Sequence, residues 1–441
     1  MRRYSQVMVC GLGASGTAAA RLLRAEGVAV LAVDERDTPE SRRTGENLAA
    51  LGCAVALGTK GPPAGEFDAA MVSPGLPRAG AFLAAVQNRG IPLVSEMELG
   101  WSRFKGRTIA VTGSNGKSSV VKALAECLVA AGQPAVPCGN YGLPVCQAVL
   151  ETPAAGWLVI EASSFQLETC SDFRPDIGVL MNVLPNHLDR HGTLEAYARL
   201  KARLFARQRE HDIALTPPEW QARFREWSGG RGRWRTFGSR PELDFMFSPH
   251  RLAAQGGIPV EIAGSYFDNE VLGPNAAALY GAALAAEAAP RTVAEVLQRF
   301  RPLPHRAEPV GEVAGVRYVN DSKATNLSAM LASIRMQNRP VWLIAGGRPK
   351  ETDFSAAVPV LRDRVRGVFL IGEAAAAMAA AWSAAVSCVN CGTLDRAVAA
   401  ARQAARPGET VLMAPACTSY DQFRAYPERG EAFRKLALEK G

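Results

Sequence analysis

The residues best suited to chemistry form one glycine-rich loop, Thr112-Gly113-Ser114-Asn115-Gly116-Lys117-Ser118-Ser119. It follows a strand-like run, Ile109 to Val111, and precedes an apolar pattern of helical period. Its glycines let backbone N–H groups approach phosphate oxygens, and a helix N-terminus adds partial positive charge. Lys117 can reach the β- and γ-phosphates, and Ser118 can ligate Mg²⁺. Because Val111 replaces the first glycine of the usual motif, we predict a shortened P-loop that binds nucleotide phosphates.

Acidic and imidazole side chains follow two later strand-like runs. Glu161 comes directly after Leu158 to Ile160, and His187 follows the run Ile177 to Met181. Ligands of an open parallel α/β sheet bind beyond the carboxyl ends of its strands. A carboxylate there suits Mg²⁺, and a neutral histidine can complete the shell of a second metal ion. We therefore predict a metal site beside the glycine-rich loop.

Lys201 is unusual because the pattern around it places it on an apolar helical face. Thr193 can cap a helix that runs to about Arg207. Tyr197, Leu204 and Lys201 then share one face at helical spacing. A lysine that points inward must be paired, snorkel to solvent or be chemically altered. The pattern alone leaves these three alternatives open.

Three further loops carry cations and hydroxyl groups, and each follows a strand-like run. They are Asp321-Ser322-Lys323-Ala324-Thr325-Asn326, Gly346-Gly347-Arg348-Pro349-Lys350 and Ala416-Cys417-Thr418-Ser419-Tyr420-Asp421-Gln422-Phe423. We expect all three at the same sheet edge, because they follow strands of one predicted parallel sheet. Such a pocket suits a small acidic substrate.

A second glycine motif, Gly11 to Gly16, stands near the N-terminus and has the complete G-x-G-x-x-G spacing. It lies between a strand-like run from Val7 and a helical stretch to Ala25, and Asp34 ends the next strand. This βαβ pattern is typical of dinucleotide-binding folds, but any nucleoside diphosphate can use the same turn.

Strand-like and helical runs alternate in three segments of the 441 residues, starting near Val7, Gly106 and Pro302. Alternation of this kind predicts an α/β protein with parallel sheets covered on both faces. Residues 207–264 lack this pattern, and we interpret them as weak antiparallel strands and loops attached to the central segment.

Composition indicates a cytosolic protein that does not insert into membranes. No apolar run approaches the ~20 residues that span a bilayer. The first strand starts almost at the N-terminus, so we expect no signal peptide. The nine cysteines are an odd number, and we expect them to be reduced and mostly buried; Cys388 and Cys391 have zinc spacing without a second pair.

The formal net charge of +8 suits anionic ligands such as nucleotides. The run Arg223 to Arg235 mixes arginine with tryptophan, which can indicate single-stranded nucleic-acid binding. We favour a solvated loop there, and expect no nucleic-acid partner.

These motifs, in this order, resemble the Mur ligase family. The resemblance is carried by Val111 to Ser119, Gly139 to Pro144, Ser163 to Thr169, Leu303 to Arg306, Asp321 to Asn326 and Ser419 to Phe423. It implies three domains: a Rossmann-like domain for a UDP substrate over residues 1–95, a P-loop ATP-binding domain over 96–301 and a Rossmann-like domain for an amino acid over 302–441.

The resemblance also implies site residues. ATP would contact Gly113, Ser114, Asn115, Gly116, Lys117, Ser118, Ser119, Asn275, Arg306, Asp321 and Lys323. Two Mg²⁺ ions would use Ser118, Glu161, His187 and a carbamylated Lys201, and the catalytic residues would be Lys117, Glu161, His187 and Lys201. The UDP-muramoyl substrate would contact Ala14, Ser15, Asp34, Glu35, Arg36, Gly75, Asn140, Ser163 and Gln166. Thr325, Lys350, Ser419, Tyr420 and Tyr426 would hold the amino acid.

The reaction that this resemblance implies joins D-glutamate to UDP-N-acetylmuramoyl-L-alanine through an acyl phosphate, for peptidoglycan synthesis, by a monomeric enzyme. The alternative is a related ligase that adds another amino acid, such as L-glutamate. The family usually shows His-Asn-x-x-Asn where this chain has Gly273-Pro274-Asn275, Phe in place of Tyr426 and Ile in place of Tyr141.

Three other classes explain less of the sequence. A nicotinamide-dependent dehydrogenase would use Gly11 to Asp34 but not the P-loop, and a P-loop translocase on nucleic acid would leave the first glycine motif unexplained. A binding protein without catalysis would not need Lys117, Glu161, His187 and Lys201 together.

Overall fold

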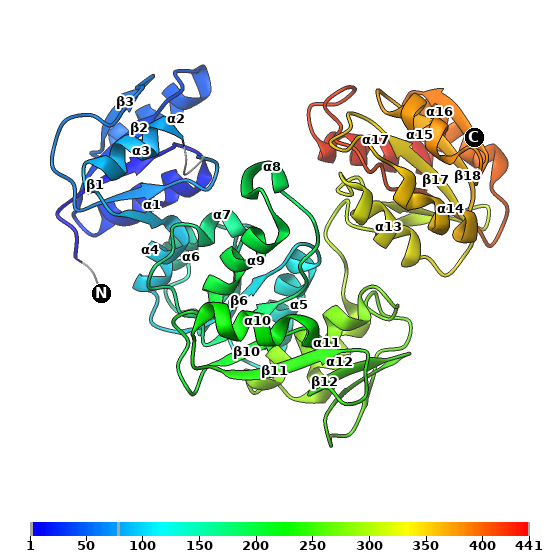
Figure 1. The fold of residues 1–441 in the computed structure, drawn as a ribbon, viewed down its shortest axis with the longest axis horizontal. Helices are drawn as coiled ribbons and strands as arrows, with labels where there is room; N and C mark the ends of the chain where they lie inside the picture. The colour runs from blue at the N-terminus through cyan, green and yellow to red at the C-terminus, as the bar shows by residue number, and fades with distance from the viewer. Residues whose placement is uncertain (1–2, 77–79, 440–441) are drawn as a thin grey trace. The chain divides into compact units, whose positions relative to one another are not determined.

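The computed structural model describes residues 3–76 and 80–439, whose strands form three sheets flanked by helices (Figure 1). The sheets contain five, nine and six strands. The predicted α/β class with three β–α segments is therefore confirmed. The first two sheets belong to one compact unit, and the third sheet, with residues 268–272, belongs to a second. In the described part of the chain, no helix is long and apolar enough to cross a membrane.

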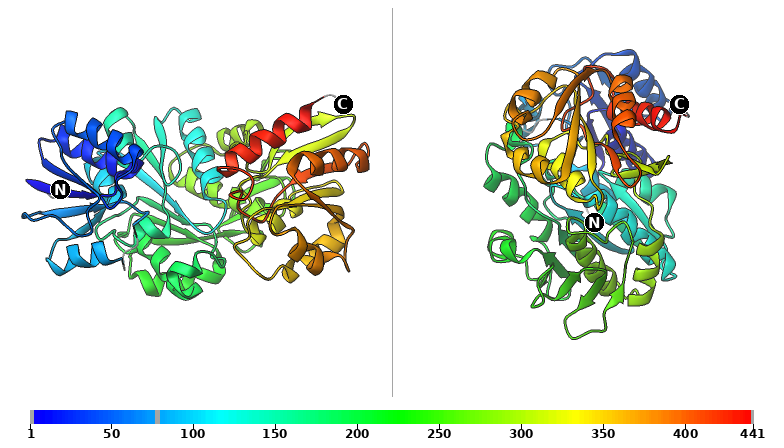
Figure 2. Two further views of the ribbon diagram at one scale, coloured as in Figure 1. Left: turned by 90° about the horizontal axis from the view of Figure 1, so that it is seen from above. Right: turned by 90° about the vertical axis from the view of Figure 1, so that its right-hand side faces the viewer.

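The first sheet is entirely parallel and confirms the predicted βαβ unit. Its elements are β1 (Gln6–Cys10), α1 (Ala14–Ala25), β2 (Ala29–Asp34), α2 (Pro39–Ala50), β3 (Ala54–Leu57), β4 (Ala69–Val72), α3 (Ala81–Asn88) and β5 (Leu93–Ser95). The strand order is β3-β2-β1-β4-β5. Leu22, Leu23 and Leu48 of α1 and α2 pack in one core cluster, whereas Phe82 and Leu83 of α3 pack in another, so helices cover both faces (Figure 2).

The second sheet has the order β14-β13-β12-β11-β10-β9-β6-β8-β7. Its strands are β6 (Arg107–Thr112), β7 (Ala135–Gly139), β8 (Trp157–Glu161), β9 (Ile177–Leu180), β10 (Ile213–Thr216), β11 (Arg233–Gly238), β12 (Phe245–Ser248), β13 (Arg251–Ala254) and β14 (Val260–Glu261). The helices are α4 (Glu96–Arg103), α5 (Lys117–Ala130), α6 (Val145–Glu151), α7 (Ser164–Leu167), α8 (Leu188–His191), α9 (Leu194–Ala202), α10 (Pro218–Ser228), α11 (Gly273–Ala285) and α12 (Pro290–Arg299), with a 3₁₀ turn at Arg203–Phe205.

Residues 207–264 differ from the prediction of antiparallel strands and loops. β10 and β11 extend the parallel sheet with α10 between them in the chain, and only β12 to β14 pair antiparallel. Trp220, Phe224 and Trp227 of α10 stack on one another and on the core beneath. The prediction is confirmed for β12 to β14 and wrong for β10, α10 and β11, because β10 is short and arginines interrupt the apolar period of α10.

The third sheet has the order β15-β16-β20-β17-β18-β19, and only β15 is antiparallel to its neighbour. The elements are β15 (Glu308–Val313), β16 (Val316–Asn320), α13 (Leu327–Arg335), β17 (Val341–Gly346), α14 (Val358–Arg364), β18 (Val365–Ile371), α15 (Ala375–Trp382), β19 (Cys388–Gly392), α16 (Leu394–Ala404), β20 (Thr410–Met413) and α17 (Tyr426–Leu438), with a 3₁₀ turn at Ser355–Ala357. The strand-like runs expected before the three loops are β16, β17 and β20.

Glu96 joins the segment after the first sheet to the second sheet's domain. It opens α4, is 3% exposed, and its carboxylate accepts a hydrogen bond of 2.6 Å from the Cys146 N–H at the start of α6. Burial raises the pKa of Glu96 to about 7, although the Cys146 N–H opposes the shift. The folded protein therefore favours the protonated carboxyl group.

We predict that this carboxyl group makes folding stability fall as the pH rises from about 4.5 to about 7. Its pKa is higher in the folded chain than in the unfolded chain, so the folded state retains the proton longer, and the loss amounts to roughly 1–3 kcal/mol. Glu96→Gln should remove this slope from thermal unfolding measured between pH 5 and 8. Glu151→Gln, at an exposed position of α6, is the control. Parallel profiles for wild type and Glu96→Gln would contradict the prediction.

Candidate active site

The glycine-rich loop joins β6 to α5, as predicted for a P-loop. Gly113 has a φ of 147° and Gly116 a φ of 86°, both in the region that side chains with a Cβ rarely adopt. The side-chain oxygen of Asn182 accepts hydrogen bonds from the N–H groups of Ser114 (3.1 Å) and Asn115 (2.9 Å). The loop is therefore held from the end of β9, and α5 begins at Lys117.

Three predicted site residues meet at one carboxylate. Glu161 ends β8 and is 3% exposed. One of its oxygens accepts a hydrogen bond of 2.5 Å from the Ser118 hydroxyl, and the other accepts one of 2.7 Å from the Asn140 amide. A buried carboxylate beside a hydroxyl supplies the hard oxygen ligands that Mg²⁺ prefers, so these residues fit a magnesium ion.

Lys201 points into the domain, as its helical spacing predicted. Thr193 caps α9 through its side chain, and the α-helix ends at Ala202, earlier than predicted. Lys201 is 1% exposed, which excludes snorkelling. Its Nζ donates to the Gly113 carbonyl at 2.9 Å and lies 4.2 Å from the centre of the Tyr197 ring.

The same Gly113 carbonyl also accepts a hydrogen bond of 2.8 Å from Lys117, whose Nζ donates to the Ser114 carbonyl at 3.0 Å as well. Burial and the nearby charge of Lys117 hold the pKa of Lys201 well below its usual range, although Glu161 opposes the shift. The neutral amine of Lys201 is thus favoured, and Lys117 supplies the charge that faces the loop.

The two histidines near α8 differ in their surroundings. His187 precedes α8 with a φ of 55°, is exposed, and its ring lies 5.0 Å from that of Phe165. His191, one helical turn later, is buried, hydrogen-bonds the Ser164 hydroxyl at 3.0 Å and stacks on Tyr197. Sequence analysis missed His191, although the spacing of four from His187 was a signal for it.

No set of three or more His, Cys, Asp or Glu side chains in residues 3–76 and 80–439 is assembled to hold a metal ion. The role of His187 as a metal ligand therefore stays a prediction. Its exposed ring would have to move to reach a metal ion.

Other predicted contacts have local structural partners. Ser163 and Gln166 form a reciprocal cap at the start of α7, with Ser163 Oγ accepting from the Gln166 N–H and Gln166 Oε1 accepting from the Ser163 N–H. Asn275, 8% exposed in α11, faces the P-loop: a Cβ on Gly116 would lie 2.5 Å from its amide nitrogen. The contact of Asn275 with ATP stays a prediction.

Asp34 fixes the first glycine motif to the end of β2. Its carboxylate accepts hydrogen bonds of 2.9 Å from the N–H groups of Leu12 and Arg36. Burial opposes ionisation, but these bonds and the Arg36 guanidinium lower the pKa of Asp34. Gly16 is required by packing, because a Cβ there would lie 1.9 Å from the Gly11 carbonyl oxygen.

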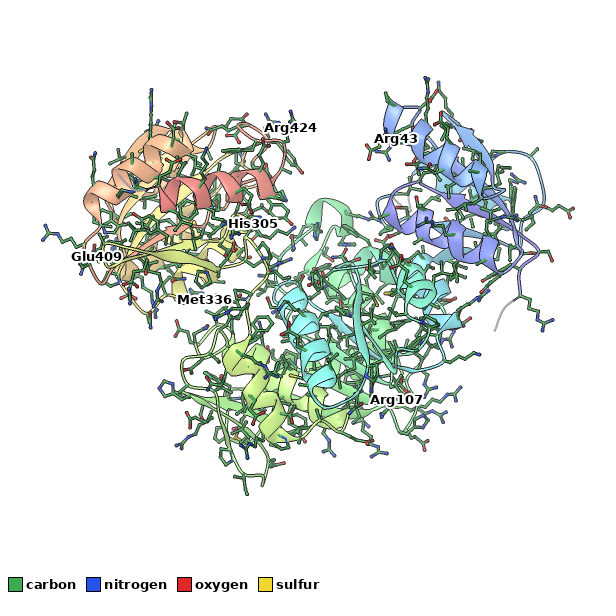
Figure 3. The ribbon with its side chains drawn as sticks, turned by 180° about the vertical axis from the view of Figure 1, so that it is seen from behind. Arg43, Arg107, His305, Met336, Glu409 and Arg424 are labelled. Atoms are coloured by element: carbon green, nitrogen blue, oxygen red, sulfur yellow. The ribbon has the colours of Figure 1, made fainter. Side chains whose placement is uncertain are left out.

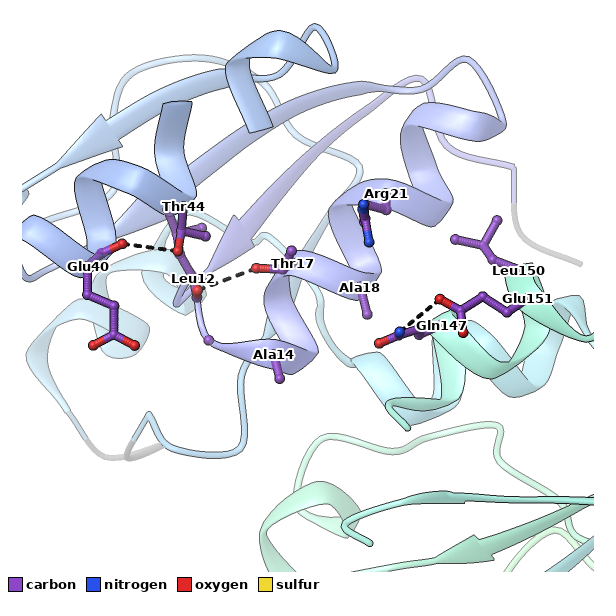
Figure 4. Close-up of a pocket in the computed structure, with 11 residues that line it drawn as sticks. Leu12, Ala14, Thr17, Ala18, Arg21, Glu40, Thr44, Gln147, Leu150 and Glu151 are labelled. Atoms are coloured by element: carbon purple, nitrogen blue, oxygen red, sulfur yellow. Dashed lines mark hydrogen bonds between the residues drawn. The ribbon is translucent and has the colours of Figure 1, made fainter. Parts of the chain in front are cut away.

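A hollow of about 500 Å³ opens beside this motif (Figure 4). Ala14 lies at its wall with Glu40 and Thr44 of α2 and Gln147 and Glu151 of α6. The predicted contacts Glu35, Arg36 and Gly75 are exposed, and Ser15 is half-buried.

The three predicted loops of the third sheet converge, as expected. Backbone hydrogen bonds join Arg348, after β17, to Thr418, after β20, and the Ser322 hydroxyl after β16 donates to the Tyr426 carbonyl. Lys323 lies 3.9 Å from the centre of the Tyr426 ring. Burial raises the pKa of Asp321 to about 6.

Within this domain the predicted amino-acid contacts differ in exposure: Ser419 is 2% exposed and Tyr420 is 62% exposed, with Lys350 exposed and Thr325 half-buried. His305, labelled in Figure 3, packs against Gly430 of α17. The neighbouring Arg306 is half-buried. Sequence analysis missed Arg429, which is buried among these loops.

The basic run Arg223 to Arg235 is not the loop that we expected, because most of it lies in α10 and β11, and it does not form one surface. Trp234 packs against Phe205 under α10, so the alternation of β11 directs Arg233 and Arg235 to the other face of the sheet. The Arg223 guanidinium lies over the Trp220 ring of α10, and Arg235 forms an ion pair with Asp244 at 3.1 Å. This arrangement favours solvated side chains over a nucleic-acid surface.

All nine cysteines are free, and seven of them are buried.

The sequence matches three family descriptions along its length: Mur ligase MurD-like, N-terminal domain over residues 5–95, Mur ligase middle domain over 111–255, and Mur ligase, glutamate ligase domain over 305–417. The chain is 37% identical to the UDP-N-acetylmuramoylalanine--D-glutamate ligase of Acidobacterium capsulatum, over 98% of this chain and 96% of that protein. It is 39% identical to the protein of the same name from Nitratidesulfovibrio vulgaris, over 97% and 94%.

Solved structures share the fold at lower identity. The MurF ligase of Thermotoga maritima in complex with ADP has a TM-score of 0.65 at 15% identity, over 93% of this chain and 94% of that one. The UDP-N-acetylmuramate-alanine ligase MurC of the same organism has a TM-score of 0.60 at 15% identity, over 98% and 99%. The chain belongs to the Mur ligase family.

Proposed function

We propose that this protein is an ATP-dependent ligase that joins D-glutamate to UDP-N-acetylmuramoyl-L-alanine. The observation that carries the proposal is the convergence of Lys117, Lys201 and the Ser118–Glu161 pair on one P-loop. Full-length relatives at 35–39% identity that bear this enzyme's name support the choice of substrates.

The reaction proceeds in two steps. The terminal carboxylate of the alanyl substrate attacks the γ-phosphorus of ATP, which forms an acyl phosphate and releases ADP. The amine of glutamate then attacks the acyl carbon, phosphate leaves, and the amine loses a proton as the amide forms. Lys117 offsets charge on the transferring phosphoryl group, so catalysis is mainly positioning and electrostatics.

Magnesium fits the oxygen ligands at Ser118 and Glu161. When bound, two Mg²⁺ ions supply charge neutralisation at the phosphates. Glu161 and the Ser118 hydroxyl would hold one ion, and His187 would contribute to the second. Asn140, which donates to Glu161, fixes that carboxylate and would contact the alanyl substrate.

Lys201 is carbamylated in the active enzyme. Its neutral amine forms an N–C bond to carbon dioxide and releases one proton, which yields an anion in place of a cation. Because burial and Lys117 already favour the neutral amine, this site is suited to the modification. The carbamate then adds oxygen ligands for magnesium.

The remaining predicted residues complete three binding regions. Ala14, Ser15, Asp34, Glu35, Arg36 and Gly75 hold the uridine diphosphate, while Asn275, Arg306, Asp321 and Lys323 contact ATP. Thr325, Lys350, Ser419, Tyr420 and Tyr426 hold glutamate. The domains run over residues 1–95, 96–301 and 302–441, and the enzyme acts as a cytoplasmic monomer in peptidoglycan precursor synthesis.

We predict that phosphate release from MgATP requires both UDP-N-acetylmuramoyl-L-alanine and an amino acid, with D-glutamate preferred over L-glutamate, L-alanine and L-lysine. A coupled phosphate assay with each amino acid measures this, and mass spectrometry identifies the product. Preference for L-glutamate would assign a sibling reaction. Equal phosphate release without any amino acid would contradict the proposal that the protein is a ligase.

We also predict that Lys201→Ala lowers kcat by on the order of 10²–10³-fold, because an electrostatic group of the transition state is lost. A short carboxylic acid added to the assay should restore part of the activity by replacing the carbamate. Lys122→Ala is the matched control, since Lys122 lies on α5 in an ion pair with Glu126. Wild-type rates in Lys201→Ala would exclude Lys201 from the site.

A further inference from the structure

Arg429 is a buried cation that no predicted role uses. It lies in the first turn of α17 and is 1% exposed. Its guanidinium donates four hydrogen bonds: from Nε to the Ser322 hydroxyl (3.0 Å), from Nη1 to the Thr418 carbonyl (3.2 Å), and from Nη2 to the carbonyls of Ser322 and Cys417 (both 3.0 Å). A single side chain therefore joins the loop after β16 to the loop after β20.

The third loop of this edge also touches Arg429. A Cβ on Gly347, after β17, would lie 3.1 Å from Nη1 and 2.3 Å from the Thr418 carbonyl oxygen. Only glycine allows this approach, because Gly347 has a φ of 125°. The three loops that carry Lys323, Lys350 and Ser419 thus meet around one guanidinium.

All four acceptors of Arg429 are neutral. Over the described ranges, no carboxylate lies within ion-pair distance of it, whereas Arg434, on the same helix, pairs with Glu308 at 2.6 Å. Burial lowers the pKa of Arg429 to about 10, although Cys417 and the Asp421 carboxylate oppose the shift, so Arg429 stays protonated at neutral pH. A buried charge of this kind is costly unless a substrate of opposite charge compensates for it.

We propose that Arg429 is a positioning and specificity residue for the amino-acid substrate: it holds the three loops in register, and its buried positive charge favours an acidic side chain over a neutral one. This inference rests on the proposed function, because it concerns the same glutamate site. Arg429 does not touch the reacting atoms; it acts through Ser322, Cys417 and Thr418, which flank the predicted contacts.

The test compares D-glutamate with its neutral isostere D-glutamine, as substrate or as competitive inhibitor. Arg429→Met should raise the KM for D-glutamate more than tenfold and lower the preference for D-glutamate over D-glutamine by a similar factor. The KM for UDP-N-acetylmuramoyl-L-alanine should change less than twofold. Arg434→Met, which removes a neighbouring paired arginine, should leave the preference unchanged.

Arg429→Lys separates charge from loop geometry, and thermal unfolding of each variant reports on folding. This variant should retain the preference for D-glutamate while the KM values for both amino acids rise together. If Arg429→Met does not fold, the preference measured for Arg429→Lys decides. An unchanged preference in Arg429→Met, or a lost preference in Arg429→Lys, would overturn the inference. Wild-type protein that is inactive with D-glutamate would instead remove the proposed function.

Discussion

Two lysine side chains share the carbonyl oxygen of Gly113, and the candidate active site depends on this arrangement. Lys117 reaches the oxygen from the first turn of α5, and Lys201 reaches it from α9. Two like charges this close to one oxygen repel each other. Burial and the charge of Lys117 hold the pKa of Lys201 well below its usual range, so the protein favours the neutral amine of Lys201.

This arrangement explains why one loop can serve both phosphate and metal. A charged Lys117 would attract phosphate oxygens, while a neutral Lys201 would not repel a metal ion at Glu161. Asn182 holds the backbone of the loop from β9, so the N–H groups of Ser114 and Asn115 cannot turn away. The carboxyl ends of three adjacent strands, β8, β6 and β9, thus fix the site together.

Much of this could be predicted from the sequence because the signals are local. The P-loop needs only a strand, two glycines and a helix, and the spacing of Tyr197, Lys201 and Leu204 was enough to place Lys201 inward. Features that depend on tertiary contacts were missed. His191 and Arg429 are polar residues in short or mixed helices; the spacing from His187 is the one local signal for His191, and nothing in the sequence around Arg429 shows that it is buried. Ser163 and Gln166 also form a helix cap that a comparison of motifs alone does not reveal.

The two compact units, each considered by itself, both bury a basic side chain among neutral oxygens, but they treat its charge differently. Lys201 in one and Arg429 in the other are almost fully buried; burial and Lys117 favour the neutral amine of Lys201, whereas Arg429 keeps its proton. A protein stabilised for its own sake would pair or replace such groups, since a buried unpaired charge costs several kcal/mol. Their retention is consistent with substrates that bring negative charge: phosphates at the P-loop and a dicarboxylic amino acid at the third sheet. Binding of a substrate with negative charge then offsets part of the free-energy cost of the buried charge, and a substrate without that charge offsets less of this cost.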